Sequence, residues 1–300
     1  DVYKRQALAF AEQTLPDFVT IPTNALAPHT VVSKVERILQ KSPREVVWHI
    51  NVSVDGIGAI HDHVRGVKGN FENCLRTLDG LLSLRERYPN LRVGVHTVIS
   101  TYTVATIRET VAFFKAIPID NHISEIAEER FELGTVGRVI TPHMEFAKTI
   151  PFLKEALGDR QEEKIRRALR HAYYDLVEKW TRDMTRQHVP CMAAIASCHI
   201  TEKGYLTGCC TRWTHKGLLG NLRQANYDIK RLWFTSQADA IRKSIKAQEC
   251  ACPLASAAYS SLLVDPKTLV KILMRYMISR MDVSSFSTPL GKRKKSEREG

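Results

Sequence analysis

Short apolar runs alternate with amphipathic helical repeats between residues 7 and 130 of the chain. The runs are rich in valine, isoleucine and threonine, which favour β-strands. The repeats place apolar residues three or four positions apart, as one face of a helix requires. This pattern predicts strands over residues 18–22, 46–53, 92–99 and 122–126, and helices over residues 32–39, 70–87 and 107–117.

Strands that alternate with helices of this length form right-handed βαβ units around a parallel sheet. The pattern therefore predicts an α/β fold, with a sheet that is either open or curled toward a barrel. We expect both faces of each strand to be covered.

Beyond residue 134 the pattern changes to charged amphipathic helices with no strand between them. The segment after them holds most of the cysteines and strand-like pieces around Lys203-Gly204. This pattern predicts helices over residues 146–157, 161–187, 237–246 and 266–280. We expect a core over residues 7–140, a helical bridge over 141–188, a small Cys-rich α+β domain over 189–260, a C-terminal helix over 261–290 and a disordered basic tail over 291–300.

Composition is that of a globular protein, with 44% hydrophobic and 25% charged residues. No stretch approaches the roughly 18 uninterrupted apolar residues of a membrane span, so we expect a cytoplasmic protein without a membrane partner. The formal net charge of +12 permits binding to nucleic acid. Part of that excess lies in the basic tail, which has no interleaved aromatic residues, so nucleic acid is not the favoured partner.

Six of the seven cysteines fall between residues 191 and 252. An odd number argues against a disulfide framework and for metal binding or redox chemistry. Cys191 and Cys209 are separated by 17 residues, and Cys250 and Cys252 form a close pair. We predict that these four thiolates form one metal site, which suits either an iron–sulfur cluster or zinc. Spacing alone leaves that choice open.

The other cysteines are weaker candidates for metal binding. Cys74 lies on the apolar face of a predicted helix and is expected in the core. Cys198 and Cys210 are less convincing ligands than the four above. A set of buried, inert cysteines is the alternative for the whole group, although the tight pair beside Pro253 is unusual for packing.

Five segments of the core resemble the radical S-adenosylmethionine (radical SAM) enzymes. Val52-Ser-Val-Asp-Gly56, His61-Asp-His-Val-Arg-Gly66 and Gly69-Asn-Phe71 are similar, in order, to that family's fourth strand, its following turn and the next helix start. Thr20-Ile-Pro-Thr-Asn24 looks like its third strand, and Val95-His-Thr-Val-Ile99 looks like its fifth. The resemblance implies a partial (β/α)6 TIM-like barrel of parallel strands.

The C-terminal third resembles the SPASM or twitch-like extension of many radical SAM enzymes. Ala194, Gly208 and Ser256 depart from it, where relatives commonly have glycine, proline and another cysteine. The resemblance implies one auxiliary [4Fe–4S] cluster, because a two-cluster extension needs more thiolates. The landmarks in order are Cys191-Met-Ala193, Ile200, Gly204, Cys209, Gly220-Asn-Leu222, Trp233, Ser236, Arg242 and Cys250-Ala-Cys252.

The sequence contains no Cys-x-x-x-Cys-x-x-Cys, the motif that holds the catalytic [4Fe–4S] cluster in this family. Residues 1–6 look like the translation of an adaptor from sequencing libraries, and we treat them as a non-native scar. We therefore expect an N-terminally truncated chain, with the motif encoded upstream in the intact protein. The fragment itself should be inactive.

The resemblance also implies which residues bind S-adenosylmethionine at the strand ends. Ser53 is the first candidate, with Asp55 and Asn24 next, and Arg65 suits the carboxylate of the cofactor. Each has a local alternative: Asp55 builds a turn, Asn24 caps one, and Arg65 is a surface residue. No catalytic residue is assigned.

Two further sets of titratable residues are weaker candidates for the site. His61 and Asp62 resemble an acid–base pair, but adjacent residues on a loop seldom face one target, and a structural role is favoured. Glu125, Glu128 and Glu129 lie near the end of a predicted strand, and a position facing the substrate cavity is considered for them but is not the favoured interpretation.

The resemblance implies reductive cleavage of S-adenosylmethionine to a 5′-deoxyadenosyl radical, which then modifies a peptide or small-metabolite substrate. An electron donor such as flavodoxin or ferredoxin is implied as a partner. Two alternatives stay open: a non-catalytic interaction protein with a zinc-binding module, and a radical SAM enzyme that modifies RNA.

Overall fold

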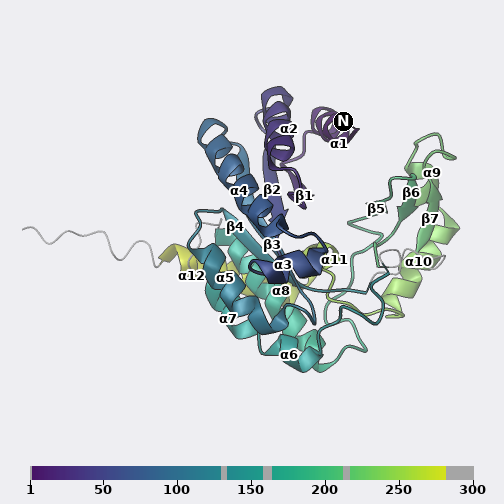
Figure 1. Ribbon diagram of the computed structural model, residues 1–300. Coiled ribbons are helices and arrows are strands. Elements are labelled where there is room, and N and C mark those ends of the chain that lie inside the picture. Colours follow the sequence, from purple (N-terminus) through teal and green to yellow (C-terminus); the bar gives the residue numbers. More distant parts are fainter. Residues whose placement is uncertain (1, 130–133, 158–163, 212–216, 282–300) are drawn as a thin grey trace, which may run out of the picture.

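The computed structural model describes residues 2–129, 134–157, 164–211 and 217–281. Its centre is a parallel sheet of four strands in the order β1-β2-β3-β4 (Figure 1). Each strand coincides with one predicted from the sequence, and the α/β fold class is confirmed. The strands are β1 (Phe18–Thr23), β2 (Val47–Ser53), β3 (Leu91–Ile99) and β4 (Asn121–Ile126).

Alternate strand side chains pack against helices on one face of the sheet. Trp48 and Val52 of β2 and Val95 of β3 are fully buried there. Their cover is formed by α2 (Pro28–Lys41) and α4 (Asn70–Arg87), whose apolar stripes belong to the same core. Burial of these aliphatic and aromatic groups is the main stabilising term for this half of the molecule.

The segment between β2 and α4 contains a helix where the sequence suggested a loop. Helix α3 (Ala59–Arg65) ends at Gly66, whose φ of 67° is the left-handed conformation that glycine adopts at helix ends. It is short, and its apolar positions are too few to show a helical period. Its position brings Arg65 back over the end of β2.

Helix α8 (Lys164–Arg182) covers the edge of β4. The Tyr174 hydroxyl donates to the Ser124 carbonyl over 3.0 Å, and Arg170 Nη1 donates to the His122 carbonyl over 3.2 Å. These side chains satisfy backbone carbonyls that an edge strand would otherwise leave unpaired.

The helix predicted over residues 146–157 is broken in two, α6 (His143–Ala147) and α7 (Ile150–Ala156). Pro151 lies at the start of α7 and has no N–H to continue the hydrogen bonds of α6. Between β3 and β4 the chain forms the short 3-10 helix η1 (Val104–Thr106) and α5 (Ile107–Lys115).

The cysteine-rich segment forms a small α+β unit, drawn in green beside the sheet in Figure 1. Its three-stranded sheet has the antiparallel order β5-β6-β7, and Lys203-Gly204 lies at the turn between the first two strands. Its apolar core includes Leu206 and Ile241 and contacts the partly buried Cys209. The elements are β5 (His199–Ile200), β6 (Tyr205–Thr207), β7 (Leu218–Asn221), α9 (Lys230–Trp233) and α10 (Ser236–Lys246).

Three more helices complete the described chain. Helix α1 (Val2–Thr14) includes residues that we set aside as a scar, α11 (Ala255–Val264) was not predicted, and α12 (Pro266–Met281) was. Residues 282–300, with the predicted basic tail, lie outside the described residues. Among the described helices, none has both the length and the apolar character of a transmembrane span.

Candidate functional site

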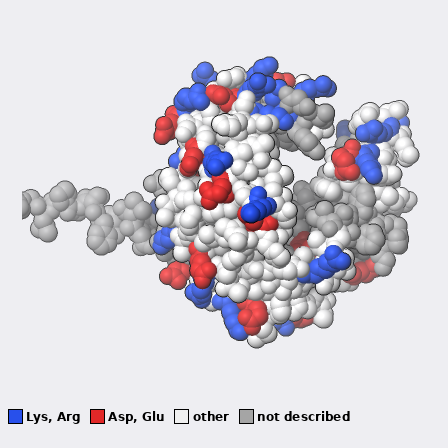
Figure 2. All heavy atoms as spheres, in the orientation of Figure 1, with Lys and Arg blue, Asp and Glu red and all other residues white. Residues whose placement is uncertain are grey.

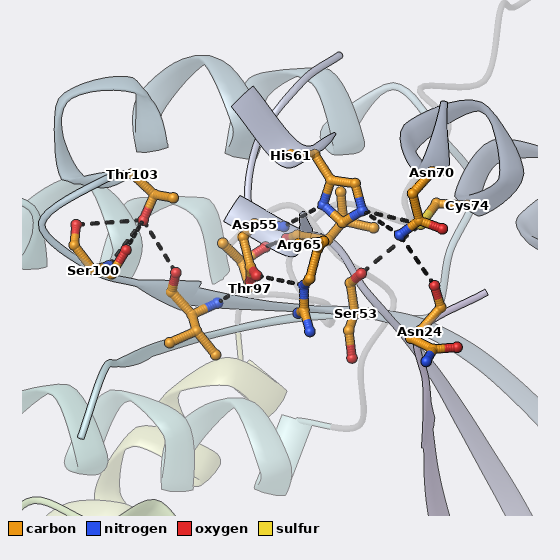
Figure 3. A network of polar contacts seen from close by, with 12 residues as sticks. Asn24, Ser53, Asp55, His61, Arg65, Asn70, Cys74, Thr97, Ser100 and Thr103 are labelled. Atoms are coloured by element: carbon orange, nitrogen blue, oxygen red, sulfur yellow. Dashed lines mark hydrogen bonds and ion pairs between the residues drawn. The ribbon is translucent and has the colours of Figure 1, made fainter. Parts of the chain in front are cut away.

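Asp55 and Arg65 meet at the carboxyl end of β2. Arg65 Nε lies 2.7 Å from Asp55 Oδ2, and the other oxygen, Oδ1, accepts from the backbone N–H of Val98 over 2.9 Å (Figure 3). Asp55 is buried, and each of its carboxylate oxygens has a partner. Through the Val98 N–H it joins the end of β2 to β3. The Asp55 side chain therefore both stabilises the turn after β2 and pairs with the Arg65 guanidinium.

His61 anchors α3 beneath this pair. The backbone N–H of Asp55 donates to His61 Nδ1 over 3.1 Å, so the ring proton must sit on Nε2. That nitrogen lies 3.0 Å from Asn70 Nδ2, which is also a donor, so its proton is directed to Cys74 Sγ at 3.5 Å (Figure 3). Burial lowers the pKa of His61, which keeps the ring neutral. Its role in the structure is to fix the turn.

Asp62 holds the start of α4. Its carboxylate accepts from the backbone N–H groups of Gly69, over 2.5 Å, and Phe71, over 2.9 Å. These bonds lower the pKa of Asp62 and satisfy donors that a helix start leaves unpaired. The structural role expected for His61 and Asp62 is confirmed, although they lie on a helix rather than a loop.

Asn24 directly follows β1, and Ser53 is the last residue of the neighbouring β2. The Asn24 side chain accepts from the Leu26 N–H over 3.4 Å, as a turn cap does, while the Asn24 carbonyl accepts from Asn70 Nδ2 over 3.3 Å. The Ser53 hydroxyl makes no hydrogen bond to a described residue. In Figure 3 it points to the same side as the terminal nitrogens of Arg65.

A cavity of about 420 Å³ opens beside these strand ends. Asp55 and Arg65 form one side of it, Glu125 and Glu128 follow from the end of β4, and Leu254 closes it from the chain just after Cys252. Pockets at the carboxyl ends of parallel strands are the usual location of active sites in this architecture.

The three glutamates at the end of β4 and just after it do not act together. Glu125 and Glu128 line the cavity, whereas Glu129 is exposed and its Oε1 accepts from the Gly137 N–H over 2.7 Å. His96 Nε2 lies 3.3 Å from Glu125 Oε2, on the neighbouring strand. The acidic residues were noticed in the sequence, but which of them face the cavity depends on the turn after β4.

Gln187 ties together the two cysteine segments of the C-terminal unit. Its Oε1 accepts from the Cys191 N–H over 3.3 Å, and its Nε2 donates to the Cys250 carbonyl over 2.9 Å. Sequence reasoning missed this residue, since a lone glutamine in a helix-to-loop transition carries no motif. Its two hydrogen bonds join segments that are distant in sequence.

Three of the four predicted metal-binding cysteines share one neighbourhood. Cys191 and Cys252 line a narrow cavity of about 30 Å³. Burial raises the pKa of Cys252 to about 12, and negative charge at Glu128, Cys209 and Cys191 raises it further. Part of the Cys252 side chain is exposed to solvent. The protein atoms packed around the rest of it nevertheless remove enough water to raise the pKa of its thiol. Among the described residues, no group of three or more Cys, His, Asp or Glu side chains is arranged to hold a metal ion.

Cys74 is in the core, as predicted, and is fully buried. Burial raises the pKa of its thiol to about 12.

Comparison with solved structures identifies the architecture. A structure of native anSMEcpe with bound AdoMet (S-adenosylmethionine) and Cp18Cys peptide matches with a TM-score of 0.52 and 14% identity, covering 94% of this chain and 81% of that one. The chain has the fold of anSMEcpe. That protein is a radical SAM anaerobic sulfatase-maturating enzyme.

A polyhistidine-tagged form of anSMEcpe with bound AdoMet gives a TM-score of 0.50 at 15% identity, covering 88% of this chain and 71% of the other. At these identities the likeness concerns the fold. A scan of protein families matches none of them to this sequence, and no curated protein matches it.

Proposed function

We propose that this chain is part of a radical SAM enzyme that cleaves S-adenosylmethionine reductively and modifies a peptide or small metabolite. The observation that carries the proposal is the set of strand-end groups around Asp55 and Arg65, which borders a cavity closed by residues next to Cys252. The anSMEcpe fold supports it, because structures of that protein contain AdoMet and peptide.

The described residues suit the amino-acid end of S-adenosylmethionine. Asp55 engages Nε of Arg65, so the terminal guanidinium nitrogens remain to bind a carboxylate. The Ser53 hydroxyl, without a partner among the described residues, suits an amine or ribose group. The Asn24 carbonyl is held by Asn70, which fixes the end of β1 for the same cofactor.

The cysteine unit suits one auxiliary [4Fe–4S] cluster. Cys191, Cys209, Cys250 and Cys252 would hold it, because thiolates match its softness and Gln187 already joins two of their segments. Bound S-adenosylmethionine, together with a catalytic cluster, would supply the radical chemistry that removes a substrate hydrogen. The protein's own groups orient the cofactor and exclude water.

The charges on one face of the molecule do not favour an RNA substrate. Over the described residues of the face drawn in Figure 2, Lys and Arg are interspersed with Asp and Glu. A phosphate backbone is bound by clustered cations, so a mixed face favours a peptide or metabolite.

Anaerobic reconstitution of the 300-residue chain with iron and sulfide tests the cluster. We expect a brown protein with sulfur-to-iron absorption, lost in Cys191→Ala and Cys252→Ala and kept in the matched control Cys198→Ala. A colourless protein with stoichiometric zinc would contradict the iron–sulfur assignment and favour the interaction protein.

Titration with S-adenosylmethionine tests the strand-end site separately. Arg65→Met should weaken binding about tenfold, as loss of one charged hydrogen bond does, while Arg76→Met, on α4, should not. A longer copy of the gene should encode Cys-x-x-x-Cys-x-x-Cys upstream. A native start codon without that motif would contradict the catalytic proposal.

A further inference from the structure

Helix α12 is apolar on two sides, and the protein covers one of them. The covered side packs on α8 and α11, where Ile272 is 1% exposed. Arg275 Nη1 lies 2.9 Å from Asp175 Oδ2 on α8, and Lys164 Nζ donates to the Ser279 carbonyl over 2.6 Å. These contacts determine which side of α12 faces away from the protein.

The uncovered side of α12 carries five apolar side chains that are each between 45% and 59% exposed. They recur at intervals of three and four residues, so they lie along one stripe of the helix. This stripe, the outer face of α12, consists of Val270, Leu273, Met274, Met277 and Ile278. The yellow end of α12 lies at the periphery of the molecule in Figure 1. A continuous exposed apolar surface of this kind marks an interaction site.

The charges on α12 are all positive. The helix contains no Asp or Glu, and Lys267 and Lys271 are exposed and form no ion pair with a described residue. Both lysines lie one helical turn from residues of the outer face. In the sequence that follows, Lys292-Arg-Lys-Lys295 outweighs Asp282. An apolar stripe beside basic residues complements an anionic lipid surface, in which acyl carbon lies beneath negatively charged phosphate groups.

We propose that the outer face of α12 binds an anionic lipid surface. Its apolar side chains enter the acyl boundary, while the stems of Lys267 and Lys271 extend beside them and place their ammonium groups at the phosphates. A second copy of the chain is a poorer match, because pairing two helices whose ionisable groups are all basic brings like charges together.

Binding of this kind is peripheral. The expectation of no membrane partner came from the search for a spanning segment, and a helix that lies in the interface does not need one. The proposal is independent of the radical SAM assignment, so either can fail without the other.

Flotation of the 300-residue chain with lipid vesicles tests the proposal. We expect vesicles of phosphatidylcholine and phosphatidylglycerol in equal amounts to bind at least about tenfold more tightly than phosphatidylcholine alone. Met277→Gln keeps the length of the side chain and removes its apolar character, so it should weaken binding about tenfold. The matched control is Met144→Gln, because Met144 is 71% exposed on α6, outside the outer face. This control should bind as the unmodified chain does.

A second pair of variants tests the charge. Lys271→Gln should weaken binding to the anionic vesicles about fivefold, as the loss of one cation near the lipid surface does. Lys243→Gln removes an exposed lysine from α10, in the cysteine unit, and should leave binding unchanged.

Four outcomes overturn the proposal: no binding to either vesicle, equal binding to both, binding that Met277→Gln leaves unchanged, or self-association that Met277→Gln abolishes. The first would favour an acidic protein as the partner, and the last, measured by light scattering, would assign the outer face to a second copy of the chain. Circular dichroism shows whether each variant folds. Ile278→Gln, on the same exposed stripe, replaces Met277→Gln if that variant does not fold.

Discussion

Ala194 and Gly208 share one small space beside the cysteine unit. Ala194 has a φ of 62°, and a side chain built on Gly208 would place its Cβ 2.7 Å from the Ala194 methyl. The two backbones are also joined, since the Ala194 N–H donates to the Gly208 carbonyl over 3.0 Å. Both positions depart from the SPASM-like pattern, and the structure shows that the two departures compensate: the larger residue is admitted because the other has no side chain.

A double-mutant cycle tests this compensation. Gly208→Ala should lower the free energy of unfolding by about 1–3 kcal/mol, because the new methyl overlaps that of Ala194. In an Ala194→Gly background the same change should be milder, with a coupling of about 1 kcal/mol. Urea denaturation measures both. Strictly additive effects would show that the two residues do not compete for space.

Gly94 fulfils a similar requirement in the main sheet. It lies between Asn51 and Asn121 on neighbouring strands, and a Cβ there would meet their side-chain oxygens closer than any real contact. Gly94→Ala should therefore destabilise the chain by about 1–3 kcal/mol, measured by thermal unfolding. Asn51→Ser in the same background should recover part of the loss. If Asn51→Ser restores none of the lost stability, the Asn51 side chain is not the source of the steric clash.

The strands and long helices were predictable because each contains enough residues for its apolar repeat to be recognised. Four strands and α4 coincide with the ranges read from the sequence. Helix α3 was missed because the turn signal of Asp55-Gly56 precedes it and few apolar positions mark it. Helix α11 mixes alanine and serine with a few larger apolar residues, so it shows no amphipathic period. The break at Pro151 was missed because the apolar period continues across it.

The sequence predicted which residues contribute to the candidate site, but not which of them contact each other. Asp55 and Arg65 were both selected, but their mutual ion pair depends on α3, which the sequence did not reveal. The cysteine positions were selected by spacing, whereas Gln187 acts through its side-chain amide and has no pattern. Long-range contacts of single polar residues arise from the fold and cannot be read locally.

The pH dependence of stability should reflect His49. Arg166 Nη1 lies 2.8 Å from His49 Nε2, and because arginine only donates, the ring must be neutral. Burial, then the charges of Arg166 and Arg92, lower the pKa of His49 to about 4. The unfolded state therefore binds more protons between about pH 4 and pH 6.5, and stability falls as the pH decreases through that window.

The size of the His49 effect should be on the order of 2 kcal/mol. His49→Gln keeps an acceptor for Arg166 and cannot titrate, so its unfolding free energy should vary less with pH over the same window. If the unfolding free energies of the unmodified chain and of His49→Gln change equally with pH, His49 is not the titrating group. Urea titrations at several pH values supply the measurement.

Arg242 holds the cysteine unit in shape. Its Nε donates to the Ala194 carbonyl over 2.9 Å, its Nη2 donates to the Trp233 carbonyl over 2.8 Å, and its guanidinium lies 5.0 Å from the centre of the Trp233 ring. Lysine cannot reproduce a planar fork with two directed bonds and a stacked face. Arg242→Lys should therefore lower the stability of this unit by about 2 kcal/mol.

Hydrogen exchange resolves that effect by segment. In Arg242→Lys, amides of β6 and β7 should exchange faster while those of β2 are unchanged, because the lost bonds lie within the cysteine unit. The matched control is Arg231→Lys, since Arg231 is exposed and its Nε lies 3.6 Å from Asp228, an ion pair worth little in water. Equal exchange in the two variants would mean that Arg242 is no more structural than a surface arginine.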